Sequence, residues 1–233
     1  MSKKNFVTFV VSSGRSGTQW LARNLDDTYA DLITVTHEPI FDDYFPREFL
    51  VERDFENIVL PSKVARHVDD IERIAQDRPY MECGWLSYGT IRYLAHRFRD
   101  CFRVVHLIRH PVTSASSMIR HKYYSPHRLE DSLNEKALLT PFDNGVLFPE
   151  YRDRWAAMGE YEKCLYFWAE LHALGLNLKE ELDVPWLRIS FETLFTQAAM
   201  RKLLNFVALP ERNAIFDALG RNEDKYRFKS NVN

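Results

Sequence analysis

Residues 6–29 read FVTFVVSSGRSGTQWLARNLDDTY, and this stretch decides the fold class. Its first seven residues form a short apolar run with β-branched side chains, which indicates a buried strand of a parallel sheet. Apolar residues then recur at helical spacing, which predicts a helix over residues 18–29. Between the two, residues 13–19 contain Gly14 and Gly17, so the chain can turn tightly from strand to helix.

The alternation of strand and helix patterns continues along the chain. Further strands are predicted at residues 32–36, 80–83, 102–108 and 185–189, and further helices at 64–75, 91–98, after Pro111 and at 192–207. Strands separated by helices favour βαβ units and a parallel sheet. The sequence therefore predicts a single α/β domain over residues 1–233, with three layers in which helices flank a central parallel sheet.

Composition excludes several classes of protein. A 45% apolar and 27% charged chain can bury a large core, and a net charge of −2 provides no general attraction for nucleic acid or an anionic membrane. The N-terminus is short and polar before a strand-length apolar run, so we expect neither a signal peptide nor a membrane anchor. The three scattered cysteines, Cys83, Cys101 and Cys164, are interpreted as buried thiols in a reducing, cytoplasmic compartment.

The loop between the first strand and the first helix is a candidate anion site. A helix start offers backbone N–H groups and the positive end of the helix dipole. The loop does not fit the nucleotide P-loop, because Ser12, Thr18 and Gln19 stand where that motif needs glycine, lysine and the magnesium ligand. With Arg15 as its cation, the loop favours chemistry that needs a fixed positive charge and no metal, such as sulfuryl transfer.

A second candidate anion site follows the strand predicted at residues 102–108. Arg109 directly follows this strand, and Ser117 lies eight residues later on the helix that follows Pro111. Arginine offers a forked pair of donors to phosphate oxygens, and serine adds a hydroxyl. Taken alone, an arginine at a strand end could equally form a surface ion pair.

Together the two motifs resemble the family of sulfotransferases that use 3′-phosphoadenosine-5′-phosphosulfate (PAPS). SGRSGTQWL resembles the family's 5′-phosphosulfate loop, and Arg109 and Ser117 have the spacing of the pair that binds the 3′-phosphate. The resemblance implies a P-loop-like fold and transfer of a sulfuryl group from PAPS to a hydroxyl acceptor, with release of PAP. It implies donor binding by Ser13, Gly14, Arg15, Ser16, Gly17, Thr18, Gln19, Arg109 and Ser117.

Other segments extend the resemblance or depart from it. Lys229-Ser230-Asn231 resembles a C-terminal segment that closes over the cofactor, although a frayed polar tail is the alternative. His110 stands where the family more often has Asp or Asn. The phenol- and steroid-type members of the family have a Lys in the first loop and a His before the second phosphate strand, whereas this chain has Arg15 in the loop and no histidine over residues 68–95. The chain is therefore more similar to the carbohydrate and tyrosylprotein branches, whose general base is typically a glutamate.

Glu38 is the candidate base, because it follows the strand at residues 32–36 and ligands gather beyond the carboxyl ends of parallel strands. Partial burial would raise its pKa and strengthen it as a base. The alternatives are that Glu38 is a surface carboxylate capping a turn, or that neighbouring His37 is the base.

Three functions remain open. A PAPS-dependent enzyme without a metal is favoured over a non-catalytic module that binds PAP or another nucleotide, and over a P-loop-type phosphotransferase. The acceptor could be a small molecule, a carbohydrate or a peptide.

Several aromatic residues could line the acceptor pocket, or could belong to the core of a helix over about 151–182. They are Tyr123, Tyr124, Tyr151, Trp155, Tyr161, Phe167 and Trp168. Residues 122–149 are predicted to form a long, mobile loop that closes as a lid, and nothing in the sequence indicates the oligomeric state.

Overall fold

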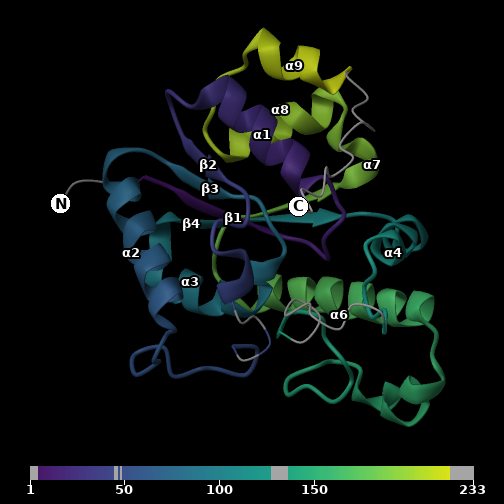
Figure 1. Ribbon diagram of the computed structural model, residues 1–233. Coiled ribbons are helices and arrows are strands. Elements are labelled where there is room, and N and C mark those ends of the chain that lie inside the picture. The colour runs from purple at the N-terminus through teal and green to yellow at the C-terminus, as the bar shows by residue number, and fades with distance from the viewer. Residues whose placement is uncertain (1–4, 45–46, 48, 127–135, 221–233) are drawn as a thin grey trace, which may run out of the picture.

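A five-stranded parallel sheet forms the centre of the protein (Figure 1). The computed structural model describes residues 5–44, 47, 49–126 and 136–220. The strands have the spatial order β2-β3-β1-β4-β5, and every neighbouring pair is parallel. Their bounds are β1 (Val7–Val11), β2 (Thr34–Thr36), β3 (Tyr80–Glu82), β4 (Phe102–Ile108) and β5 (Trp186–Ser190).

Helices cover both faces of the sheet and complete three layers, as predicted (Figure 1). One face carries α2 (Ser62–Asp77), α3 (Ile91–Phe98), α4 (Pro111–Arg120) and α6 (Glu160–Glu181). The other carries α1 (Thr18–Tyr29), α7 (Phe191–Leu194), α8 (Gln197–Phe206) and α9 (Asn213–Leu219). Short 3₁₀ turns lie at Phe41–Asp43, Leu86–Thr90, Arg99–Cys101 and Pro149–Ala157. None of the helices in the described part is long and apolar enough to cross a membrane.

Alternation along the central strands explains the two cores. In β4, Val104 faces the core under α3 and α6, whereas Val105 and Leu107 face the core under α1 and α8. Side chains on a strand point alternately to the two faces, so a strand buried on both faces is apolar throughout. This is why the apolar runs could be recognised as strands in the sequence. All three cysteines are buried thiols, as expected.

Some predicted elements are shorter or divided. The strand expected at 32–36 begins only at Thr34, because the N–H groups of Leu32 and Ile33 bond to the carbonyl of Tyr29 and close α1. The helix expected over 192–207 is two helices, because the Thr196 hydroxyl accepts a bond from the Ala199 N–H and starts α8. The helix expected over about 151–182 starts only at Glu160, after a 3₁₀ turn over Pro149–Ala157.

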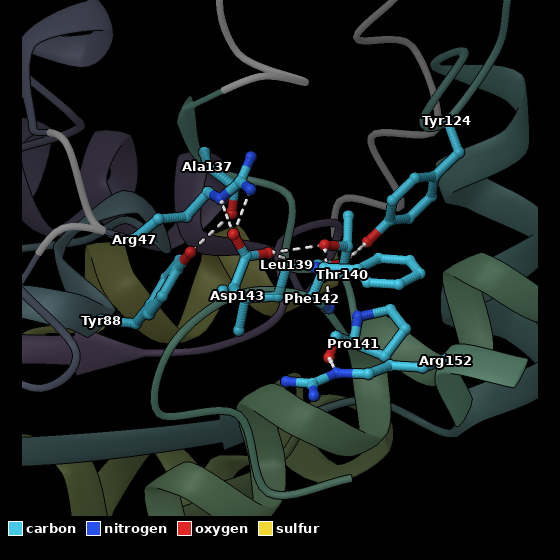
Figure 2. Close-up of polar contacts among 10 residues, drawn as sticks. All are labelled: Arg47, Tyr88, Tyr124, Ala137, Leu139, Thr140, Pro141, Phe142, Asp143 and Arg152. Carbon is cyan, nitrogen blue, oxygen red and sulfur yellow. Dashed lines mark hydrogen bonds and ion pairs between the residues drawn. The ribbon is translucent and has the colours of Figure 1, made fainter. Parts of the chain in front are cut away.

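The segment predicted to be a lid is largely built into the protein on its C-terminal side. Ala137, Leu138 and Leu139 are buried in the core. The hydroxyl of Tyr88 donates to the carbonyl of Ala137 at 2.6 Å, and the hydroxyl of Tyr124 donates to that of Leu139 (Figure 2).

Two charged contacts fix the next turn of this segment. Arg47 pairs with Asp143, and Arg152 donates to the carbonyl of Pro141 at 2.7 Å (Figure 2). Asp143 also accepts the N–H of Thr140 at 2.6 Å. Residues 137–143 are therefore packed against the rest of the protein in this structure. Closure of residues 122–149 as a lid stays a prediction, and residues 127–135 lie outside the described residues.

Candidate functional site

The loop between β1 and α1 has the backbone of an anion cradle. Gly14, Arg15 and Gly17 have φ values of 76°, 54° and 81°. The Ser12 hydroxyl accepts the Gly14 N–H at 3.1 Å, and the Ser16 hydroxyl donates to the Gly14 carbonyl at 3.0 Å. Among the described residues no side chain caps the start of α1, so its first amides can face an anion.

Both glycines of this loop are required by close neighbours as well as by their backbone angles. A Cβ atom on Gly17 would lie 3.0 Å from the ring of Phe191. A Cβ atom on Gly14 would lie 3.2 Å from the hydroxyl of Tyr123 and 3.3 Å from the ring of Trp85. Any other residue at either position would have to push these rings aside while adopting an unfavourable φ.

The two motifs that are distant in sequence meet at Arg15. Its Nε atom donates to the Ser117 hydroxyl on α4 at 3.3 Å, across 102 residues of sequence. The guanidinium of Arg109 donates to the Arg15 carbonyl at 2.7 Å. Burial lowers the pKa of the Arg15 guanidinium, which nonetheless stays charged near neutral pH. The structure thus brings Arg15, Arg109 and Ser117 together at one edge of the sheet.

Arg109 is held by contacts around its whole length. Its Nε atom donates to the Thr113 hydroxyl at 3.2 Å, and its guanidinium lies 4.5 Å from the centre of the Phe191 ring. The indole of Trp168 on α6 donates to the Arg109 carbonyl at 2.8 Å. These contacts hold the Arg109 guanidinium against the loop.

Glu38 is a buried carboxyl group, and so the alternative of a surface carboxylate is wrong. Its side chain is 8% exposed, and Oε1 accepts the backbone N–H of Trp85 at 3.1 Å. A Cβ atom on Gly84 would lie 2.6 Å from Cγ of Glu38, so this glycine makes room for the carboxyl group. Burial raises the pKa of Glu38 to about 7, which confirms the expected direction and suits a general base near neutral pH.

His37 lies beside Glu38 and contacts Thr18, the first residue of α1. Its Nε2 atom is 3.3 Å from the Thr18 hydroxyl, and its Nδ1 atom is 3.9 Å from Oε2 of Glu38. Burial lowers the pKa of His37, and the charge of Arg15 acts in the same direction. Burial therefore favours the neutral imidazole of His37, which lies between Glu38 and the start of α1.

A second buried carboxyl group, missed in the sequence, lies at the end of β3. Glu82 is 1% exposed and accepts hydrogen bonds from the hydroxyls of Tyr44 and Tyr80, the latter at 2.8 Å. His67 Nε2 lies 2.8 Å from it. Burial and the charge of Glu38 raise the pKa of Glu82 well above its usual range. Negative charge on Glu82 and negative charge on Glu38 therefore disfavour each other.

The remaining predicted residues differ in how they could contact a ligand. Ser13 has a buried hydroxyl with no hydrogen-bond partner among the described residues, which a bound anion could satisfy. The Ser16 and Thr18 hydroxyls are engaged within the protein, and the Gln19 side chain is exposed. Lys229 lies outside the described residues.

The candidate acceptor aromatics divide between core and periphery. Tyr123 and Phe167 are buried in the core, and Tyr124 and Tyr161 pack against it.

Among the described residues, no group of His, Cys, Asp and Glu side chains could hold a metal ion.

Comparison with known proteins identifies the fold. The chain matches no protein-family model and no curated protein. It is similar to the sulfotransferase domain from the curacin biosynthetic pathway, with 14% identity and a TM-score of 0.56 over 93% of this chain and 78% of that one. It is also similar to the sulfotransferase domain of the Synechococcus PCC 7002 olefin synthase, with 15% identity and a TM-score of 0.55 over 94% of this chain and 79% of that one. A third similar structure is that of a mouse sulfotransferase complexed with PAP, with 19% identity and a TM-score of 0.54 over 99% of this chain and 69% of that one.

The structural matches establish a shared fold, and sequence identities this low establish nothing beyond the fold. The chain has the P-loop-like α/β fold of sulfotransferases, with its two candidate anion-binding segments at the carboxyl ends of β1 and β4.

Proposed function

We propose that the protein is a sulfotransferase that moves a sulfuryl group from PAPS to a hydroxyl acceptor and releases PAP. One observation carries the proposal: Arg15 contacts both Ser117 and Arg109, so the loop cation and the candidate 3′-phosphate pair form one site. The second support is Glu38, a buried carboxyl group with a pKa of about 7 that is electrostatically coupled to Arg15. The complex of the mouse sulfotransferase with PAP supports the choice of donor.

The reaction is a direct in-line displacement. Glu38 takes the proton of the acceptor hydroxyl while the oxygen of that hydroxyl forms a bond to sulfur. The bond between sulfur and the bridging oxygen breaks, and its electron pair leaves with the 5′-phosphate of PAP. Arg15 stabilises the charge that develops on the bridging oxygen and the sulfonate. It does not act as an acid, because guanidinium keeps its proton near neutral pH.

Ligands and setting follow the same proposal. The loop amides, Ser13 and Arg15 hold the 5′-phosphosulfate, and Arg109 with Ser117 holds the 3′-phosphate, with no metal. The acceptor is a hydroxyl of a small molecule, a carbohydrate or a peptide, and the protein acts as a single cytoplasmic domain. A glutamate base links the protein to the carbohydrate and tyrosylprotein branches of sulfotransferases.

Replacing the base tests the proposal. Glu38→Gln removes the proton acceptor and keeps the shape of the side chain, so turnover with PAPS should fall by roughly 10² to 10⁴ while PAP affinity changes little. In the wild type, kcat/KM should rise with pH through about 7, where Glu38 ionises. Glu211→Gln, which removes an exposed carboxylate paired with Arg201, is the matched control and should be silent.

The possible results separate the alternatives. Loss of PAP binding together with activity would make Glu38 structural, and normal activity would transfer the role of base to His37. Tight PAP binding without transfer to any of a broad acceptor panel would indicate a binding module. Magnesium-dependent turnover of ATP would indicate a phosphotransferase.

A further inference from the structure

Tyr123 is held in an unusual position just after α4. Its neighbours Lys122 and Tyr124 both have φ values of 58°, a region that bulky residues rarely adopt. The Tyr123 N–H bonds to the Met118 carbonyl at 3.2 Å, and the side chain is only 4% exposed. Two unfavourable backbone conformations therefore turn this one side chain into the protein, and such strain persists only where the surrounding structure enforces it.

The hydroxyl of Tyr123 reaches the loop between β1 and α1. It lies 3.2 Å from the place where a Cβ atom of Gly14 would be, at the residue before Arg15. The phenol is also electrostatically coupled to the Arg15 guanidinium. The side chain of Tyr123 thus extends from the segment just after α4 and ends beside the cation of the candidate transfer site.

An aromatic wall fixes the ring. The centre of the Tyr123 ring lies 5.8 Å from that of Trp85 and 6.4 Å from that of Phe167. The Trp85 side chain touches the same side of Gly14, and its backbone N–H holds Glu38. The Tyr123 hydroxyl therefore lies at the point where the loop, its cation and the wall that carries the base converge.

We propose that Tyr123 is a further donor-contacting residue, whose hydroxyl hydrogen-bonds a terminal oxygen of the sulfonate of PAPS. This inference rests on the proposed function. A sulfonate presents three terminal oxygens that need donors, and a phenol supplies one without adding charge or displacing Arg15. The rigid ring also places that donor without the loss of side-chain freedom that a longer polar residue would suffer.

The test compares two neighbouring tyrosines and two ligands. Tyr123→Phe deletes the hydroxyl and keeps the ring in the aromatic wall. Tyr124→Phe deletes a hydroxyl that bonds to the Leu139 carbonyl, and is the matched control. Calorimetry on the full chain measures the affinity of each variant for PAPS and for PAP, which lacks the sulfonate. Tyr123→Phe should weaken PAPS binding by about three- to tenfold, the usual effect of one lost hydrogen bond, and leave PAP within twofold.

The outcomes distinguish this inference from the proposed function. Equal weakening of PAP and PAPS by Tyr123→Phe, or no weakening of either, overturns the role of Tyr123 while the proposed function stands. The same PAPS-selective loss in Tyr124→Phe also overturns it, because the effect would then be general to this segment. A wild-type chain that binds neither ligand overturns both the proposed function and this inference.

Discussion

The carboxyl ends of β1 and β4 both lead into a helix at the candidate site, but they are built in different ways. After β1 the chain bends through three residues of positive φ and enters α1 without a side-chain cap from the described residues. After β4, an extended His110 leads directly into Pro111, the first residue of α4. Pro111 has no N–H group, so this second helix start has fewer backbone donors for an anion.

The difference separates two ways of binding an anion. At the β1 end the backbone would be the binding group. Glycine is required there because a Cβ atom would lie only 3.0 Å from a ring at Gly17 and 3.2 Å from a phenol hydroxyl at Gly14. At the β4 end the side chains of Arg109 and Ser117 would be the binding groups under the proposed function. The two ends are joined, because Arg109 donates to the Arg15 carbonyl. A change at the β4 end should therefore affect recognition of the 3′-phosphate first and the loop second.

The largest effect is expected from Arg109→Ala. Two charge-assisted hydrogen bonds of about 1.5 to 3 kcal/mol each would be lost with the 3′-phosphate, which weakens PAP binding by roughly 10² to 10⁴. The hydrogen bond to the Arg15 carbonyl would be lost as well, so the affinity for 5′-AMP should also fall, by about tenfold or less. Calorimetry against both ligands measures the two parts.

Equal losses for PAP and 5′-AMP would show that Arg109 only supports the loop. Arg109→Lys is the companion variant, because it keeps a point charge and loses the forked geometry. It should lie between the wild type and Arg109→Ala for PAP.

Arg15→Ala tests the β1 end, where the side chain is expected to act on the reaction more than on donor binding. Turnover should fall by roughly 10² to 10³, the usual effect of losing a donor to developing charge. Arg15→Lys should retain more activity, since a positive charge remains. Single-turnover measurements with PAPS separate the chemical step from binding, and turnover within twofold of the wild type in Arg15→Ala would remove Arg15 from the mechanism.

The smallest effect concerns pH, to which the two ends respond differently. Beneath β4, His106 Nε2 lies 2.9 Å from Nδ1 of His172, and both rings are buried. Burial lowers the pKa of His106 to about 4 and of His172 to about 3. The unfolded chain protonates these rings below about 6.5, so the stability they permit is complete above that pH and falls as the pH decreases toward about 4.

Acid should therefore reduce activity first, through Glu38 near pH 7, and stability afterwards. Thermal unfolding midpoints between about pH 7 and about pH 4 measure the second effect. His172→Gln removes one titrating ring and should make the midpoint less dependent on pH. An equally steep decline in the wild type and the variant would assign the acid sensitivity to other groups.

Local patterns in the sequence were enough to place most of the fold and both anion motifs. The helices at Thr18–Tyr29 and Ile91–Phe98 and the strand at Phe102–Ile108 have the predicted bounds. Apolar runs, helical spacing and glycine or proline at the turns are properties of neighbouring residues, and so they can be recognised without the fold. The divided helices were missed because their breaks depend on a few capping contacts.

The sequence by itself determined an α/β chain with a glycine-rich loop, a strand followed by Arg109, and Glu38 as a candidate at the end of another strand. Only the tertiary structure decided how these groups behave. Burial raises the pKa of the Glu38 carboxyl group to about 7, and the carboxyl group packs beside Gly84 and accepts the backbone N–H of Trp85, 47 residues away. Tyr123 and Glu82 became visible in the same way, because burial and electrostatic coupling arise from residues that only folding brings together.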